Sequence, residues 1–259
     1  MSKPTLLFAV VVVSFLLASP GLAQAVEENQ PLNFAVLQYR HVPPENVEEF
    51  VHLETTYWSE VARKAITDGK MVEWELWQKV GGWNLDEGSN FLFVNIFEKR
   101  EDLDHINEIW NPSEVFPDVR VPSIDTGRLS TVKHQMFVQA EAVVGEQRAQ
   151  FVRLNYAKAS DLARYIELEK TVWQPFITER MNANKTDVTS WAVVSVLIPS
   201  GASIPFNAFT VDGFQTLSGA ISPSFDPDTE FPDLTELNEV HTKDRILTYA
   251  LVKRVSGDQ

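Results

Sequence analysis

The sequence contains no cysteine and few basic residues. Its 259 residues include 22 Lys and Arg against 36 Asp and Glu, which gives a formal charge of -14 at pH 7. Without cysteine, thiol mechanisms, disulfide frameworks and cysteine metal sites are excluded. The shortage of basic residues argues against nucleic-acid binding, because phosphate contacts need clustered Lys and Arg. The acidic charge also disfavours binding to anionic membranes.

Only one long apolar run is present, and it lies near the N-terminus. Lys3 precedes the apolar residues 6–18, and the segment 23–25 (Ala-Gln-Ala) follows as a small-x-small cleavage site. This pattern predicts a signal peptide over 1–25 and a mature chain of about 234 residues. We therefore expect a secreted or periplasmic protein with no membrane span after cleavage. An uncleaved anchor is the alternative, but about 13 helical residues fall short of a roughly 30 Å hydrocarbon core.

Apolar residues make up 44 % of the sequence and aromatic residues 11 %. This composition is typical of a globular protein with a sizeable core, and it excludes disordered, collagen-like and coiled-coil chains.

The most informative feature of the sequence is an internal repeat. Residues 50–58 (FVHLETTYW) and 165–173 (YIELEKTVW) share Leu, Glu, Thr and Trp at an offset of 115. The same offset carries the Phe-Pro-Asp triplet at 116–118 onto that at 231–233. Two separate matches at one spacing predict a duplicated unit of about 115 residues.

The two predicted repeats cover residues 26–145 and 146–259 and have the same order of elements. Alternating and helical periodicities indicate strand, helix, two strands, a short helix with a Pro-rich loop, and a final strand. This order predicts two tandem ferredoxin-like βαββαβ units in an α+β fold, which cover each other's sheet faces. The expected elements are strands at 34–41, 71–79, 91–98 and 132–143 with helices at 47–66 and 101–110, and strands at 149–157, 188–197, 205–211 and 246–255 with helices at 159–181 and 213–220.

The repeated motifs carry a resemblance to a known superfamily. The F-x-x-L-x-Y strands at 34–39 and 151–156, the L-E-x-T-x-W helices, and the second strands bearing Trp74 and Trp191 resemble the dimeric α/β-barrel superfamily. The likeness is greatest to its NIPSNAP-type and EthD-like members. It implies a pseudo-dimeric barrel within one polypeptide, either monomeric or weakly homo-oligomeric.

The resemblance implies a fold more than a reaction. Members of the superfamily include cofactor-free monooxygenases, isomerases, haem enzymes and proteins of unknown role. No haem-ligand motif or monooxygenase catalytic pattern of that family can be carried over residue by residue, so no cofactor is expected.

The repeated glutamates Glu54 and Glu169 are weak candidates for catalysis. Each falls inside the apolar stripe of its predicted helix, where desolvation raises a carboxyl pKa unless a donor holds the group ionised. The strand tyrosines Tyr39 and Tyr156 are predicted to face the helices. A Glu-Tyr or Glu-Trp hydrogen bond within each unit is therefore one interpretation, and acid–base chemistry is the other.

The opposite strand face is predicted to point into the barrel. It would place Gln38, Arg40, Arg153 and Asn155 in a cavity, where Arg forks and amides could orient a carboxylate or carbonyl ligand. Alternatively, these side chains could satisfy one another between the sheets.

Other motifs carry less information. The five histidines form no H-x-H or H-x-x-x-H pair, so no metal site is expected. Trp77, Trp83 and Trp110 are candidates for exposed platforms, and the repeated Phe116 and Phe231 either plug the barrel mouth or pin their loops to the core.

Three functional hypotheses follow. The first is an exported protein that binds a small, partly apolar molecule in a half-barrel pocket. The second is a cofactor-independent monooxygenase- or isomerase-like enzyme. The third is a structural or interaction protein with a filled barrel. A cavity beside Gln38 and Asn155 would favour the first two.

Overall fold

The computed structural model describes residues 33–81, 88–145 and 148–257, which belong to one compact unit. Eight strands and a set of helices alternate along the chain. The strands are β1 (Phe34–His41), β2 (Glu73–Lys79), β3 (Phe91–Phe97), β4 (Thr131–Gly145), β5 (Phe151–Ala159), β6 (Val188–Ile198), β7 (Ala208–Phe214) and β8 (His241–Ser256). The helical elements are η1 (Pro44–Asn46), α1 (Val47–Leu53), η2 (Glu54–Trp58), α2 (Ser59–Thr67), η3 (Arg100–His105), α3 (Ile106–Ile109), α4 (Pro112–Val115), α5 (Val121–Ile124), α6 (Leu162–Leu168), η4 (Glu169–Trp173), α7 (Gln174–Asn182), α8 (Leu217–Ile221) and α9 (Thr235–Val240).

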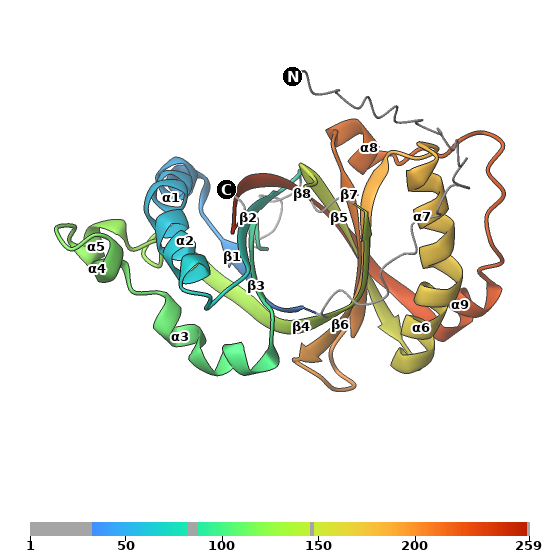
Figure 1. Cartoon of the computed structure of the whole chain (residues 1–259), viewed down its shortest axis with the longest axis horizontal. Helices are drawn as coiled ribbons and strands as arrows, with labels where there is room; N and C mark the ends of the chain where they lie inside the picture. The colour runs from blue at the N-terminus through green and yellow to red at the C-terminus, as the bar shows by residue number, and fades with distance from the viewer. Residues whose placement is uncertain (1–32, 82–87, 146–147, 258–259) are drawn as a thin grey trace, which may run out of the picture. The chain divides into compact units, whose positions relative to one another are not determined.

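The strands form a closed, antiparallel barrel in the order β1-β3-β2-β8-β5-β7-β6-β4 (Figure 1). The order β4-β1-β3-β2 in the first half of the chain matches β8-β5-β7-β6 in the second. Two seams join these halves, where β2 pairs with β8 and β4 pairs with β6. Closure leaves no unpaired edge among the described strands, which removes the usual site of edge-to-edge aggregation.

The long strands β4 and β8 make closure possible. Each pairs with the first strand of its own half and then continues onto the other half. Register shifts interrupt both seams, at Ala140/Ala142 on one side and Leu76/Trp77 on the other. Such bulges increase local twist and bend a strand, as a strand shared by two sheets requires.

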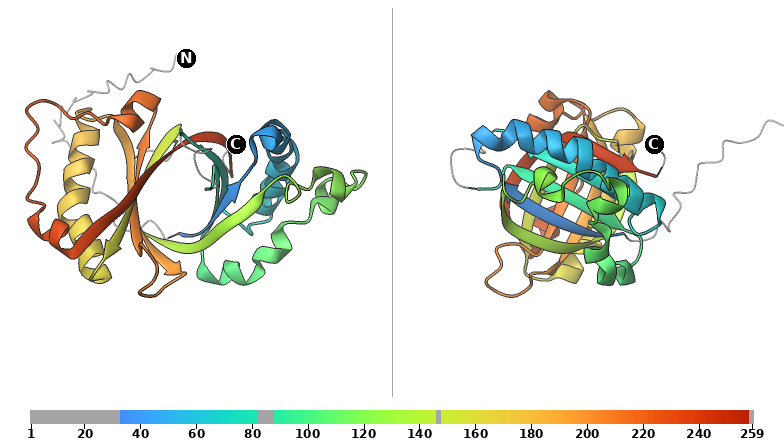
Figure 2. Two further views of the ribbon diagram at one scale, coloured as in Figure 1. Left: turned by 180° about the vertical axis from the view of Figure 1, so that it is seen from behind. Right: turned by 90° about the vertical axis from the view of Figure 1, so that its left-hand side faces the viewer.

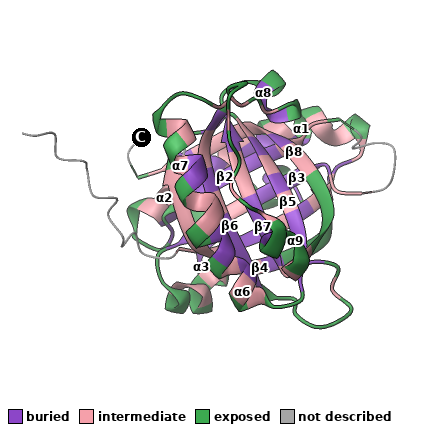
Figure 3. Cartoon of the chain, turned by 90° about the vertical axis from the view of Figure 1, so that its right-hand side faces the viewer, coloured by how far each residue is buried: buried purple, intermediate pink, exposed green. Residues whose placement is uncertain are grey.

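The sheet is buried on both faces. Helices α1 and α2 cover the first half from outside and α6 and α7 cover the second, as two further views show (Figure 2). Three apolar clusters result: one beneath each helical layer and one inside the barrel. Buried residues accordingly occupy most of the strands and the inner helix faces, while the outer helix faces, the loops and the first residues of β4 and β8 are largely exposed (Figure 3).

Each long helix contains one π-helical turn, and the two turns lie 115 residues apart in the chain. In the first half it begins at Glu54, and in the second at Glu169. A π turn inserts one extra residue into the helix and is frequent at functional sites. Helical periodicity alone did not predict this irregularity.

The expected elements are largely confirmed, with shifts in the second half. The strand expected at 205–211 lies at Ala208–Phe214, and the helix expected at 213–220 lies at Leu217–Ile221. Asn207 directly precedes the strand, and its side-chain amide bonds both backbone groups of Ala159 at the end of β5. The short helices α4, α5 and α9 within the two Pro-rich loops were not predicted.

The predicted signal peptide, at 1–25, lies outside the described residues. Among the residues described, none of the helices has the length and apolar character needed to cross a membrane.

Candidate functional site

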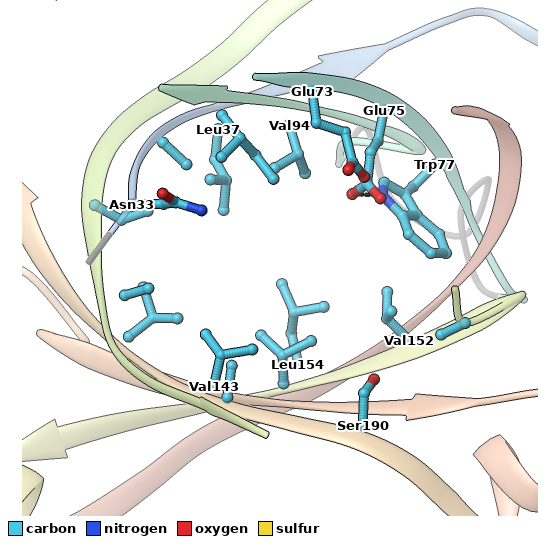
Figure 4. A pocket seen from close by; sticks show the side chains of 18 of the residues that line it. Asn33, Leu37, Glu73, Glu75, Trp77, Val94, Val143, Val152, Leu154 and Ser190 are labelled. Atoms are coloured by element: carbon cyan, nitrogen blue, oxygen red, sulfur yellow. Dashed lines mark hydrogen bonds between the residues drawn. The ribbon is translucent and has the colours of Figure 1, made fainter. Parts of the chain in front are cut away.

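The barrel interior contains a cavity of about 200 Å³. Its walls are mostly aliphatic and come from all eight strands, with Leu37 and Val94 on one side and Val143 and Leu154 on the other (Figure 4). A cavity with such walls favours an apolar molecule, because water there would find few hydrogen-bond partners.

One polar cluster interrupts the apolar wall, at the seam between β2 and β8. Glu73, Glu75 and Trp77 alternate along β2, so their side chains all point inward. Arg254 on β8 is the register partner of Glu75. Its Nε lies 2.6 Å from Glu75 Oε1 and 3.0 Å from Glu73 Oε1, and Trp77 Nε1 donates to Glu75 Oε2 at 2.8 Å.

The cluster contains two carboxylates but only one guanidinium. Burial raises the pKa of Glu73 to about 8, the neighbouring Glu75 raises it further in the same direction, and Arg254 opposes both. At neutral pH, Glu73 is therefore mostly a protonated acid beside a carboxylate held by two donors. Such a pair can donate a hydrogen bond or a proton from one group and accept from the other.

The opposite seam has no charged residue at the equivalent positions. With Trp74 aligned on Trp191, the positions of Glu73, Glu75 and Trp77 correspond to Ser190, Ala192 and Val194. Ala192 pairs with Val143, as Glu75 pairs with Arg254. The charged groups of the cavity therefore lie on one seam only.

Tyrosines fill the other end of the barrel. Tyr39 and Tyr156 share a short hydrogen bond between their hydroxyls, and His134 stacks on the Tyr39 ring with centroids 4.0 Å apart. Tyr249 is fully buried beside them, and burial raises the pKa of all three phenols. The barrel is therefore filled at this end and hollow at the end with the cavity.

The predicted direction of the strand faces was wrong. Leu37 and Tyr39 point into the barrel, whereas Val36 and Arg40 lie on the face that the helices cover. The cause is that both faces of the sheet are buried, so alternation separates two faces without showing which one meets the helices. The tyrosines consequently bond to each other across the barrel and do not reach the glutamates.

The four predicted ligand-binding residues lie outside the cavity. Gln38 donates to Gln135 at 2.9 Å and accepts from Arg40 Nε at 2.6 Å. In the second half, Asn155 donates to Asp212 at 2.8 Å. Arg153 is also near Asp212 and lowers its pKa, although burial is the larger effect and raises it. These groups thus bond within each half and not between the sheets.

Both repeated glutamates are buried, as expected, between a helix and the sheet. Burial raises the pKa of each to about 7. Thr126 donates to Glu54 at 2.6 Å and Arg40 lies nearby. Tyr165, one helical turn earlier, bonds Glu169. A Glu-Tyr bond therefore exists in the second half, with a helix tyrosine in place of the strand tyrosine.

The remaining candidates occupy structural positions where they are described. Trp77 is buried in the barrel, contrary to the prediction of an exposed platform, and Trp83 lies outside the described residues. Phe116 contacts Tyr57 and Phe231 contacts Phe176, so both pin their loops to helices. In the described part of the chain, no three His, Cys, Asp or Glu side chains converge as a metal site requires.

Sequence analysis missed the charged cluster of the cavity. The signal was present in β2 (Glu-Trp-Glu-Leu-Trp), where two glutamates share one strand face with a tryptophan. Arg254 could not have been linked to them from sequence, because it lies 179 residues after Glu75.

Comparison with known proteins shows the fold. No family model and no curated protein matches the sequence. A provisionally named monooxygenase from Lactobacillus acidophilus is similar in structure, with TM-score 0.53, 12 % identity, and coverage of 88 % of this chain and 97 % of that one. An anthrone oxidase-like protein has TM-score 0.53 and 10 % identity, with coverage of 89 % and 95 %. A provisionally named monooxygenase from Fusobacterium nucleatum has TM-score 0.53 and 10 % identity, with coverage of 87 % and 94 %. The chain therefore shares the α+β barrel fold of these proteins, with eight antiparallel strands.

Proposed function

We propose that this protein binds a small, largely apolar molecule inside the barrel, between the β2–β8 seam and the aliphatic wall opposite. The cavity of about 200 Å³, with its polar groups gathered on one side, carries the proposal. A dry, apolar cavity of about 150 Å³ suffices to bind benzene. The volume here therefore suits a ligand of one ring with a short substituent, smaller than most drug-sized molecules.

We also propose that one barrel arises from two tandem ferredoxin-like repeats, 26–145 and 146–259. The repeated strand order β4-β1-β3-β2 supports this arrangement. A second support is a pair of asparagines, Asn90 and Asn207, which lie 117 residues apart. The side-chain amide of Asn90 bonds the N–H and the carbonyl of Val42, just after β1. The amide of Asn207 bonds the same two groups of Ala159, at the end of β5. The protein would then be a monomeric pseudo-dimer or a weak homo-oligomer.

Export remains part of the proposed function. The Lys3, apolar and Ala-Gln-Ala pattern at residues 1–25 supports a secreted or periplasmic location. A pocket held together without disulfides is compatible with either compartment.

A second candidate is a cofactor-independent enzyme of the isomerase or monooxygenase kind. Glu73 and Glu75 favour it, because a protonated acid beside a fixed carboxylate can return a proton to one atom while removing one from another. The names of the structural neighbours point in the same direction. Solvent deuterium appearing in the α-position of a bound cyclic ketone would favour this function over binding alone.

Filling the cavity tests the binding function. Ala192→Phe places a ring in the cavity from the apolar seam and should abolish binding of toluene and benzyl alcohol measured by calorimetry. Ala183→Phe, at the exposed end of α7, is the matched control and should bind both compounds as the original protein does. If the unaltered protein binds neither compound and carries no small molecule in native mass spectrometry, the proposed function is wrong.

A further inference from the structure

The side chains at the β2–β8 seam do not balance in charge. Glu73 and Glu75 both approach Arg254, at 3.0 and 2.6 Å. All three are shielded from solvent, with side-chain exposures of 16, 10 and 10 %. With both carboxyl groups ionised, the cluster therefore has one negative charge that no side chain neutralises.

Among the residues that the structure describes, no other charged side chain lines the cavity. On β3 the residues beside Glu73 are Ile96, its register partner, and Val94, which are both apolar. On β8 its register partner is the uncharged Ser256, two residues after Arg254 of the cluster. The polar groups elsewhere on the wall, Asn33 and Ser190, are uncharged. An uncompensated charge is costly away from water. The extra negative charge of the cluster can therefore be neutralised in two ways, by a proton on Glu73 or by a cation in the cavity.

Resting on the proposed binding function, we infer that the cavity selects a small ring with a protonated amine, and that the ammonium group takes the place of the Glu73 proton. The ring would occupy the aliphatic part of the cavity, and the ammonium group would lie against the carboxylates. The net reaction balances: the ligand enters with one positive charge and one proton leaves Glu73 for solvent.

Proton release gives this inference a quantitative signature. Because the pKa of Glu73 is raised to about 8, one proton must be displaced per ligand bound at pH 6. The affinity for a permanently protonated amine should then rise about tenfold from pH 6 to pH 7. A neutral ring of the same size displaces no proton, so its affinity should not change over that interval.

Calorimetry with benzylamine, benzyl alcohol and benzoate tests the inference. We expect benzylammonium to bind more tightly than benzyl alcohol at pH 7, to release about one proton at pH 6 in buffers of different ionisation enthalpy, and to show the tenfold pH effect. Benzoate should bind most weakly. Glu73→Gln should abolish the proton release and the pH effect, yet still bind benzyl alcohol.

Glu141→Gln is the matched control, since Glu141 lies on β4 of the opposite seam and outside the cavity lining, where it accepts from Ser195 at 2.6 Å. It should retain both the proton release and the pH effect. If Glu73→Gln does not fold, the proton count on the unaltered protein decides alone.

The outcomes separate the two proposals. If benzyl alcohol binds while benzylammonium binds no better, or binds without releasing a proton, the inference is overturned and the binding function stands. If benzoate binds most tightly, Arg254 is the recognition group and the inference is again overturned. If none of the three binds, the inference is overturned, and the binding function fails with it when native mass spectrometry also shows no retained small molecule.

Discussion

At the scale of single residues, buried carboxyl groups are the chemically distinctive feature of this protein. Glu54, Glu73 and Glu169 each have a raised pKa, and burial is the largest cause for each. They differ in surroundings. Glu73 faces a cavity, whereas Glu54 and Glu169 lie between helix and sheet, with Oε2 of Glu169 lacking a hydrogen bond among the described residues. Cavity access makes Glu73 the stronger functional candidate.

The raised pKa of Glu54 predicts a pH-dependent stability. The carboxyl group of Glu54 releases its proton near pH 4.5 in the unfolded chain and near pH 7 in the folded chain. The protonated group therefore contributes fully to the stability of the fold below pH 4.5, and this contribution is lost as the pH rises through 7. Glu54→Gln should remove this effect. The free energy of unfolding of the original protein should fall between pH 5 and pH 8, and in Glu54→Gln this fall should be smaller by up to about 3 kcal/mol. Urea denaturation at both pH values measures the difference.

Glu48→Gln provides the comparison, because Glu48 is exposed on the same helix. Its profile should follow that of the original protein. An unchanged pH dependence in Glu54→Gln would show that the carboxyl group is ionised in the folded protein throughout this range.

At the scale of elements, strand ends and seams were harder to predict than strands. Periodicity located all eight strands, yet it placed β7 three residues too early, at 205–211 instead of Ala208–Phe214. The asparagine amides at the strand ends explain the true boundaries, since they substitute for a missing backbone partner. Asn90 is fully buried and bonds both the N–H and the carbonyl of Val42 at 2.8 Å.

Asn90→Ala should therefore destabilise the protein by about 2–4 kcal/mol, because two buried backbone groups lose their partners. Urea denaturation measures this loss. Asn111→Ala, which removes only an exposed bond to Glu114, should change stability by less than about 0.5 kcal/mol. Equal effects of the two variants would contradict the role assigned to Asn90.

At the scale of the whole molecule, the two halves depend on each other. The seams β2–β8 and β4–β6 join strands from opposite halves, and the interior cluster takes residues from both. The charged cluster lies at the β2–β8 seam, and the β4–β6 seam has no equivalent among the described residues. The barrel therefore contains one charged site, whereas two identical halves would have produced two.

This interdependence predicts one cooperative unfolding transition. Far-ultraviolet dichroism and tryptophan fluorescence should report the same midpoint, since Trp74 and Trp77 lie in the first half and Trp191 in the second. Asn207→Ala, which weakens only the second half locally, should lower the midpoint of both signals together. Two separate transitions would show that the halves fold independently.

Local periodicity in the sequence predicts the order of strands and helices and the burial of Glu54 and Glu169, because each of these depends on residues close together in the chain. Which strand face lines the barrel depends on tertiary packing, because both faces are apolar enough to be buried. The position of the site depends on tertiary packing as well. Glu75 and Arg254 are 179 residues apart and meet only because the barrel closes at their seam.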